Sequence, residues 1–500
     1  MNRSPLDSED QSVQQPEGSV QSLATKASKS AVWSLGGFGA QQVVRLGSNL
    51  VLTRLLVPED FGLMALVQVF LTALALFSDI GIGPAVIQHH RSDRDFLNTI
   101  WTLQVFRGLA IFLVAFLLAS PYADFYEDPR LLLLIQVSAV SSVADGFRST
   151  SFFTLNRELN VKPLILLTLG TQLVTVCVMI PWAAAYHTVW AIVAGSVAGA
   201  VFESVLSHIV LDGQRNWFRL EREALRFARS FGVWIFVATA ITFTADNLDR
   251  LIFGKLSTLS ELGVYSIAAL LATVPSQALG SVSSSVLFPL YSRIYHSDRD
   301  LQDVFNSARW AILVLSGWVS AGWIGGGPTI VRILYDERYW DAGWMMQALV
   351  SGLWFGVTLQ YTNGAATLAA GRSDLTSAYS FAKLLGISAL IPLGYWLYGF
   401  PGAVLGLAAS DVFRYAVSLY GVRLIGLTGA RQDLGLSARV AASALTSWLA
   451  VVGSIALGID LPWIHAGIVF VVATAFWVGP LSVLIGRFRR KEPLLLGDIE

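Results

Sequence analysis

Long apolar stretches alternate with short polar segments along this chain from residue 30 to residue 486. Each stretch has about 20 or more residues, which is enough for a helix to cross a hydrocarbon core of about 30 Å. The pattern therefore predicts about fourteen transmembrane helices. They lie near 30–56, 60–87, 96–119, 130–154, 161–185, 188–211, 230–254, 262–290, 303–331, 343–370, 374–398, 402–425, 438–458 and 463–486.

The composition points to the same class of protein. Of the 500 residues, 54% are hydrophobic and only 14% are charged, whereas soluble domains carry about 25% charged residues. The predicted fold is therefore an all-α integral membrane protein. Its single cysteine, Cys177, excludes an intrachain disulfide. The predicted loops on the side opposite the termini are short, which excludes a separate enzyme domain there.

Polar segments divide the predicted helices into groups. Six spans precede the longest polar connection, six follow it, and two more close the chain. The predicted parts are a disordered cytoplasmic tail, an N-lobe, a cytoplasmic linker, a C-lobe, a final pair of spans and a second cytoplasmic tail. They occupy residues 1–25, 26–211, 212–229, 230–425, 426–487 and 488–500, respectively.

The linker carries five arginines, and their spacing of 4, 3, 4 and 3 residues places them on one face of a helix. These are Arg215, Arg219, Arg222, Arg226 and Arg229. Apolar side chains fall on the opposite face. We expect this basic amphipathic helix to lie in the membrane surface, with its arginines against anionic lipid headgroups.

A short repeat relates the two halves of the chain. Arg54-Leu-Leu and Phe61-Gly-Leu in the first half match Arg250-Leu-Ile and Leu262-Gly-Val in the second half. Six spans per half preserve orientation, so the halves would be two parallel bundles related by a pseudo-two-fold axis along the membrane normal. Transporters of this design bind their substrate near mid-membrane, between the halves, and rock about it.

The distribution of basic residues predicts the orientation in the membrane. Most of the 34 lysines and arginines fall on the side that holds both ends of the chain. Positive loops stay in the cytoplasm, so this asymmetry predicts cytoplasmic N- and C-termini. It also agrees with an even number of spans.

Five basic residues near the middle of predicted spans are candidates for a central cationic cavity that binds substrate: Arg45, Arg107, Lys383, Arg309 and Arg414. A charge costs at least about 2.5 kcal/mol at the bilayer centre unless it is paired or solvated. Arginine and lysine suit an anionic substrate group, and arginine can bind a phosphate or carboxylate in a bidentate manner. The structural alternative is an ion pair, such as Asp411 with Arg414 at i, i+3.

Acidic residues at span ends are candidates for coupling or gating. They are Asp79, Asp145, Glu203, Asp246 and Asp249, together with the adjacent Arg250. Burial would raise the pKa of such a carboxyl group toward the range of proton coupling. The alternative is local pairing, for example Asp145 with Arg148. Asp246 and Arg250 are spaced i, i+4 and are expected to pair on one helix face near the outer boundary.

Signatures of enzyme chemistry are absent from the sequence. The six histidines are scattered and there is no cysteine cluster, so no metal site or cofactor is expected. There is no P-loop and no nucleophile elbow. We therefore expect a protein that is not an enzyme and does not bind nucleic acid.

Several stretches resemble the polysaccharide transporter, or lipid-linked oligosaccharide flippase, family. They are Leu52-Thr-Arg-Leu-Leu-Val-Pro-Glu-Asp-Phe-Gly62, Asp79-Ile-Gly-Ile-Gly-Pro, Asp249-Arg-Leu-Ile-Phe-Gly and Val286-Leu-Phe-Pro-Leu-Tyr-Ser-Arg293. The resemblance is closest to exporters of bacterial exopolysaccharide and O-antigen repeat units. It implies two six-helix bundles, commonly with two extra helices, in the bacterial inner membrane. It also implies an undecaprenyl-diphosphate-linked oligosaccharide as the substrate.

The favoured interpretation is a flippase that moves this lipid-linked oligosaccharide by alternating access. Its other expected partners are membrane lipids and the polysaccharide polymerase or export machinery. One alternative is a cation-coupled small-molecule antiporter of the multidrug type, from the same superfamily. Another is a membrane scaffold for a polysaccharide synthase complex, which would leave the charges inside the spans without a role.

Overall fold

The computed structural model describes residues 17–78, 93–158, 160–295 and 301–489, and in these residues all the regular secondary structure is helical. The helices are α1 (Glu17–Leu55), α2 (Pro58–Phe77), α4 (Arg94–Tyr126), α5 (Arg130–Ser138), α6 (Val140–Gly146), α7 (Ser151–Arg157), α8 (Lys162–Tyr186), α9 (Trp190–Val210), α10 (Arg222–Leu256), α11 (Leu259–Val282), α12 (Phe288–Tyr295), α13 (Leu301–Leu334), α14 (Ala342–Leu353), α15 (Gln360–Ala369), α16 (Ser373–Leu424), α17 (Ala430–Ala456) and α18 (Pro462–Arg489). Two π-helical segments, η1 (Ser283–Leu287) and η3 (Trp354–Leu359), join α11 to α12 and α14 to α15, and a short 3₁₀ turn, η2, covers Glu337–Tyr339.

The predicted all-α membrane class is confirmed. Among the described residues, ten helices are long and apolar enough to cross a membrane, or up to eleven when the bent pair formed by residues 130–146 and 151–157 counts as one span. The first helix begins at Glu17, earlier than the predicted end of the N-terminal tail.

Helix α16 is a hairpin of two antiparallel arms. Its 52 residues are interrupted at Tyr398 and Gly399, where the φ of Gly399 is +65°. This left-handed backbone favours glycine because a Cβ atom would be strained. A Cβ on Gly394 would lie 2.6 Å from the carbonyl carbon of Gly402, so the two arms approach backbone to backbone. The predicted spans 374–398 and 402–425 correspond to these arms.

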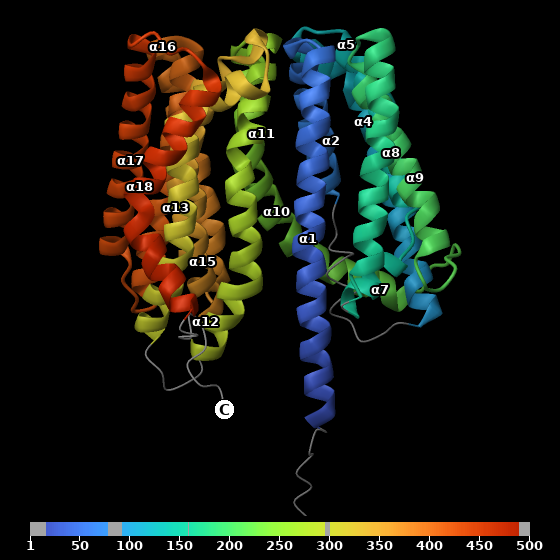
Figure 1. The fold of residues 1–500 in the computed structure, drawn as a ribbon. Helices are drawn as coiled ribbons and strands as arrows, with labels where there is room; N and C mark the ends of the chain where they lie inside the picture. The colour runs from blue at the N-terminus through green and yellow to red at the C-terminus, as the bar shows by residue number, and fades with distance from the viewer. Residues whose placement is uncertain (1–16, 79–92, 159, 296–300, 490–500) are drawn as a thin grey trace, which may run out of the picture.

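The helices form two groups that lie side by side (Figure 1). The N-lobe contains α1 to α9 and the C-lobe contains α10 to α18, with α10 packed against helices of both lobes. The first residues of α1 and the last residues of α18 lie at the same end of the bundle (Figure 1). We call this end the terminal end, and the opposite end, where the two lobes meet, the closed end.

The closed end is built on a reciprocal crossing of α2 and α11. A Cβ on Gly62 would lie 2.9 Å from the carbonyl carbon of Leu259, and a Cβ on Gly263 would lie 2.6 Å from the carbonyl carbon of Pro58. The first turn of each helix therefore packs directly against the glycine of the other helix. Small residues allow this approach, which stabilises membrane helices because lipid offers no hydrophobic driving force between them. The two glycines are the ones matched by the sequence repeat.

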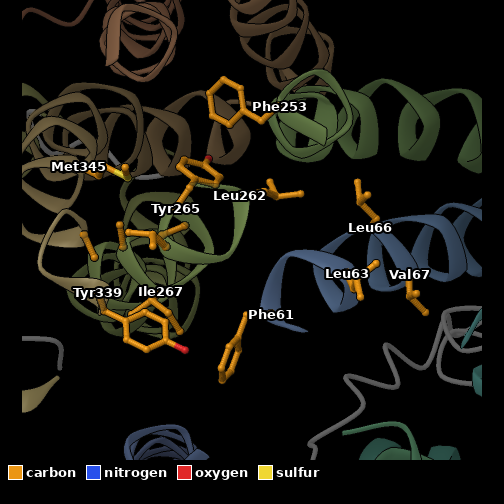
Figure 2. Packing of buried hydrophobic residues seen from close by; sticks show 14 of the residues in the cluster. Phe61, Leu63, Leu66, Val67, Phe253, Leu262, Tyr265, Ile267, Tyr339 and Met345 are labelled. Atoms are coloured by element: carbon orange, nitrogen blue, oxygen red, sulfur yellow. The ribbon is translucent and has the colours of Figure 1, made fainter. Parts of the chain in front are cut away.

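Side chains around the crossing form one apolar cluster that both lobes share (Figure 2). Phe61 of α2 and Tyr339 of the C-lobe meet edge to face, with ring centroids 6.1 Å apart. Polar contacts then seal the rim: the Tyr126 hydroxyl donates to the Leu251 carbonyl over 3.1 Å. The Nζ of Lys255 lies 2.7 Å from Oε1 of Glu127 in an exposed ion pair.

The linker between the lobes corrects a prediction. Residues 212–221 are extended rather than helical, and α10 begins only at Arg222. Their backbone N–H groups bond to side chains of α4 at every second residue: Trp217 N–H donates to Asn98, Arg219 N–H to Thr102 and Glu221 N–H to Thr99, each over 3.0 Å. These long-range bonds satisfy the donors that a helix would have satisfied internally. The arginine spacing therefore does not produce a separate amphipathic helix across 212–229.

Candidate functional site

A cavity of about 720 Å³ opens inside the C-lobe, between α10, α11, α15 and α16. Its lining includes Asp246, Lys383 and Arg414, and extends to Phe288 and Thr376. Phe288 begins α12, which lies toward the terminal end (Figure 1). Both π-helical segments border it, through Ser283 and Val357, and π-bulges occur frequently at functional sites.

Four charged side chains form a network at this cavity. Lys383 Nζ lies 3.7 Å from Oδ1 of Asp246 and 3.5 Å from Oδ1 of Asp411. Arg414 Nη2 also lies 3.5 Å from Oδ1 of Asp246. Two cations therefore face two carboxylates, one carried by α10 and one by the second arm of α16. The predicted alternative, in which Asp411 pairs with Arg414, is not the pairing found, because Asp411 lies against Lys383.

The two carboxylates of this network have different surroundings. The Asp411 side chain is 6% exposed, whereas that of Asp246 is 45% exposed and lines the cavity. Gly356 of η3 makes the room for Asp411, because a Cβ at this position would lie 2.5 Å from the carboxyl carbon. Asp411 is thus a fixed, buried partner of Lys383, and Asp246 is the accessible one.

The N-lobe contributes Arg45 to the edge of the same cavity. Arg45 Nη2 donates to Oε1 of Gln277 on α11 over 3.1 Å, and Gln42 donates to the same oxygen over 2.9 Å. Gln277 lines the cavity. The Nε of Arg45 and the Nε of Arg414 are both buried and have no hydrogen-bond partner among the described residues. Arginine donors without acceptors are the groups that an anionic ligand would satisfy.

Arg107 lies elsewhere in the N-lobe. Its Nη2 donates to the Ala75 carbonyl over 2.6 Å and its Nε to the Ser78 hydroxyl over 3.1 Å, at the C-terminal end of α2. A cation there complements the helix dipole and the open carbonyl groups of the last turn. The structure therefore gives Arg107 a helix-capping contact.

The two acidic candidates of the N-lobe that the structure describes, Asp145 and Glu203, do not line the cavity. Glu203 pairs with Arg148, with Oε1 and Nη1 3.1 Å apart. The expected pairing of Asp145 with Arg148 is thus replaced by one between α9 and the bend after α6, and Asp145 itself is exposed. Asp79 lies outside the described residues.

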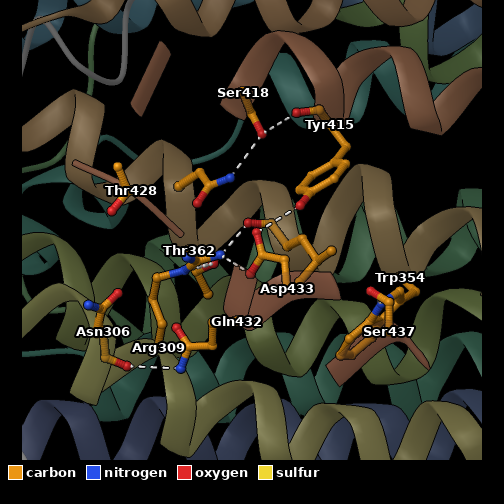
Figure 3. Close-up of polar contacts among 12 residues, drawn as sticks. Asn306, Arg309, Trp354, Thr362, Tyr415, Ser418, Thr428, Gln432, Asp433 and Ser437 are labelled. Carbon is orange, nitrogen blue, oxygen red and sulfur yellow. Dashed lines mark hydrogen bonds and ion pairs between the residues drawn. The ribbon is translucent and has the colours of Figure 1, made fainter. Parts of the chain in front are cut away.

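Arg309 does not line the cavity, in contrast to its predicted role. It is fully buried, and its Nη2 lies 2.6 Å from Oδ1 of Asp433 while its Nε donates to Thr362 over 2.9 Å (Figure 3). The Tyr415 hydroxyl donates to the other oxygen of Asp433 over 2.8 Å. This network joins α13, α15 and α16 to α17. Arg309 therefore attaches α17 to the rest of the C-lobe.

The remaining gating candidates lie on α10 beyond the cavity. The buried carboxylate of Asp249 accepts a hydrogen bond from the Tyr265 hydroxyl. Arg250 donates to Asn247 over 3.4 Å. The expected pair of Asp246 with Arg250 is not formed, because Asp246 turns toward the two cations of α16.

Sequence reasoning missed two polar residues that organise these sites. Gln277 links Arg45 to the cavity, and Asp433 neutralises Arg309. Gln277 lies two residues after Pro275, which interrupts a predicted span, and this is a signal that could have been used. Asp433 lies in the segment after the repeat, where the sequence offered no pattern to match.

Residues 51–343, more than half of the chain, match the family described as polysaccharide biosynthesis protein. The chain belongs to this family. This confirms the resemblance seen in the sequence, and with it a transporter family of polysaccharide biosynthesis instead of an enzyme.

Three relatives give the same picture. The lipopolysaccharide biosynthesis protein WzxC of Escherichia coli (strain K12) is 23% identical over 414 residues, which cover 80% of this chain and 81% of the relative. The putative O-antigen transporter of Shigella flexneri is 23% identical over 400 residues, or 75% of this chain and 93% of the relative. The teichuronic acid biosynthesis protein TuaB of Bacillus subtilis (strain 168) is 19% identical over 360 residues, or 68% and 72%.

Solved structures share the fold. The lipid II flippase MurJ, in an inward closed conformation, superposes with a TM-score of 0.72 at 12% identity, covering 92% of this chain and 99% of that structure. A multidrug resistance MATE family transporter of the MOP superfamily, in an inward-facing conformation, gives a TM-score of 0.60 at 12% identity, covering 79% and 95%. This member of the polysaccharide biosynthesis family therefore shares its fold with a multidrug transporter.

Proposed function

We propose that this protein moves an undecaprenyl-diphosphate-linked oligosaccharide repeat unit across the bacterial inner membrane by alternating access. The observation that carries the proposal is the cavity of about 720 Å³, which is lined by Lys383 and Arg414 of the C-lobe and by Gln277, the hydrogen-bond partner of Arg45 of the N-lobe. Membership of the polysaccharide biosynthesis family supports a polysaccharide precursor as the cargo, as do relatives described as a lipopolysaccharide biosynthesis protein and a putative O-antigen transporter.

The chemistry of the cavity fits a diphosphate headgroup. A diphosphate is compact and multiply charged, so it can accept hydrogen bonds from a lysine and two arginines at once. The unpartnered Nε atoms of Arg45 and Arg414 are available as donors. Amide and hydroxyl groups around them, including Gln277, Gln360 and Tyr361, suit the adjoining sugars. The isoprenoid tail would remain in the bilayer while the sugars cross through the polar interior.

The proposed architecture has fourteen crossings in two six-helix bundles with two extra C-terminal helices. To the ten helices that pass the span criteria we add the bent pair, the second arm of α16, and α1 and α10, which run along the bundle (Figure 1). The reciprocal crossing of Gly62 and Gly263 supports a pseudo-two-fold relation between the lobes.

We also propose that the terminal end is cytoplasmic, as the excess of basic residues on that side predicts. The closed end would then face the periplasm, and the structure would represent an inward-facing state. Headgroup binding in the cavity would be followed by rocking of the lobes, which would separate α2 from α11 and open the closed end.

The deciding experiment is reconstitution of the purified protein in liposomes that carry a fluorescent undecaprenyl-diphosphate oligosaccharide in one leaflet. The protein should move the lipid to the other leaflet, and Arg45→Ala and Lys383→Gln should each abolish movement at unchanged protein content. Arg372→Gln serves as a control, because Arg372 is exposed and pairs with Asp374 outside the cavity. Failure of the wild-type protein to move the lipid, with a matched flippase active in the same assay, would remove the proposal.

The same liposomes test the multidrug alternative. A cationic dye loaded inside them should be retained by the wild-type protein. Export of the dye without movement of the oligosaccharide lipid would reassign the protein to small-molecule antiport.

A further inference from the structure

The charge balance of the cavity raises a question about how an anion enters it. Lys383 and Arg414 would attract a diphosphate, yet Asp246 and Asp411 already neutralise them. A headgroup that approaches this network meets no net positive charge from these four residues. Binding therefore requires the headgroup to displace one of the two carboxylates from Lys383 or Arg414.

The surroundings of the two carboxylates determine which one the headgroup can displace. Asp411 is enclosed against Gly356 and is 6% exposed at its side chain. Asp246 is 45% exposed, faces the cavity, and shares one oxygen between two cations at 3.5 and 3.7 Å. These distances are longer than the 2.7–2.9 Å of a tight charge-assisted hydrogen bond. The 3.5 Å between Lys383 and Asp411 is similarly long, so exposure distinguishes the two carboxylates, and Asp246 is the more accessible partner.

We infer that Asp246 is a specificity-determining residue, whose carboxylate occupies the headgroup's place on Lys383 and Arg414 until the substrate displaces it. This inference rests on the proposed function and deepens it. A headgroup must contact both cations to replace a carboxylate that they share. A diphosphate has enough oxygens to do so, whereas a monophosphate held by one cation leaves Asp246 in place on the other.

Displacement of Asp246 also has a structural consequence, because Asp246 belongs to α10. The next turns of α10 hold the closed end, where Leu251 accepts from Tyr126 and Lys255 pairs with Glu127. The Asp246 contacts tie the same helix to α16 of the C-lobe. When the headgroup replaces the carboxylate, α10 loses its ion pairs with α16. Occupation of the cavity thereby affects the same helix that holds the contacts of the closed end.

The binding test uses purified protein in lipid nanodiscs, with inorganic pyrophosphate and inorganic phosphate as probes and calorimetry as the readout. The wild-type protein should bind pyrophosphate more tightly than phosphate. Asp246→Asn removes the competing charge, so pyrophosphate affinity should rise at least about fivefold, equivalent to about 1 kcal/mol, the upper range for exposed ion pairs. Binding of phosphate alone should become measurable.

The transport test uses the oligosaccharide lipid in the liposome assay. Asp246→Asn should lower KM and lower kcat together, because the headgroup binds without competition but has no carboxylate to displace it on release. Loss of structure alone would not tighten binding. Asp374→Asn is the matched control: it removes a carboxylate from the same C-lobe, on α16, at an exposed pair with Arg372, and should leave both parameters unchanged.

The outcomes separate the inference from the proposed function. Lipid transport by the wild-type protein, with pyrophosphate affinity unchanged or weakened in Asp246→Asn, would overturn the role of Asp246 and leave the flippase assignment intact. Absence of lipid transport in the wild-type protein would instead remove the proposed function. Asp246→Ser removes the same charge with a smaller side chain and provides the measurement if the asparagine variant does not fold.

Discussion

The α2–α11 crossing predicts the effect of adding a single methyl group. In Gly263→Ala the new Cβ would lie 2.6 Å from the carbonyl carbon of Pro58, below the 3.0 Å that real Cβ atoms respect. Optimal carbon contacts are about 3.5–4.0 Å, so relief requires the helices to separate by about 1 Å. The obstructing atoms belong to the backbone and cannot rotate away. Overpacking of this kind costs about 1–3 kcal/mol.

That cost applies only when the closed end is closed, so it should shift the balance of conformations. About 1–3 kcal/mol corresponds to a change of roughly 5- to 150-fold in the equilibrium between closed and open forms. The assay is cross-linking between cysteines introduced at Glu127 and Lys255, whose side chains meet at 2.7 Å, in a Cys177→Ser background. Gly263→Ala should reduce the cross-linked fraction and slow lipid transport. Gly453→Ala is the control, since a Cβ there meets no atom within 4 Å.

The reasoning would be refuted by the double variant Gly62→Ala/Gly263→Ala if it cross-linked and transported like the wild-type protein. The two substitutions act on the same crossing from opposite sides. Their effects should therefore not add fully, because one separation of about 1 Å relieves both contacts.

Three further predictions concern ion pairs and packing. Arg309→Met leaves Asp433 buried without its cation and should cost about 3–5 kcal/mol, seen as a lower midpoint of thermal unfolding; adding Asp433→Leu should recover most of the loss, and no recovery would contradict the pairing. Gly356→Ala should displace Asp411, because the new methyl would lie 2.5 Å from its carboxyl carbon, and should reduce lipid transport while Gly322→Ala does not. Lys255, the partner of Glu127, holds the pKa of this carboxyl group below its ordinary value of 4.5. The ion pair therefore stabilises the closed end fully above that value, and this stabilisation is lost as the pH falls through the lowered pKa. A protein labelled on both lobes should show a constant interlobe distance from pH 8 to 5 and opening only below 4.5.

Much of the fold was accessible from the sequence because lipid imposes strong constraints on it. Each membrane helix must satisfy its backbone internally, so long apolar stretches report helices directly. The repeat also identified the matched glycines, Gly62 and Gly263, which the structure places in one crossing. Local pattern and long-range contact agree at this point, since a close approach needs a small residue in both copies.

The charged residues were harder to assign for a physical reason. A cation in an apolar span is expensive whether it faces a cavity or a buried carboxylate. Lys383 and Arg309 therefore look alike in sequence, although one lines the cavity and the other is enclosed with Asp433. Only the contact between distant segments separates them. The prediction of a helical linker was wrong for the same reason. Its arginines have helical spacing, but three side chains of α4 bind its backbone in a non-helical form.

The extended linker also determines which segment of the chain must move when the angle between the two lobes changes. Its backbone is fastened to α4 of the N-lobe up to Glu221, so it cannot act as a slack tether. Among the residues whose side chains the structure describes, the first ion pair from α10 to the C-lobe is at Asp246, about 36 Å from Arg222 at 1.5 Å per residue. A rotation between the lobes therefore has to involve α10, because the linker that precedes it is held to α4. Helix α10 therefore connects the linker that the N-lobe holds to the charged network of the C-lobe.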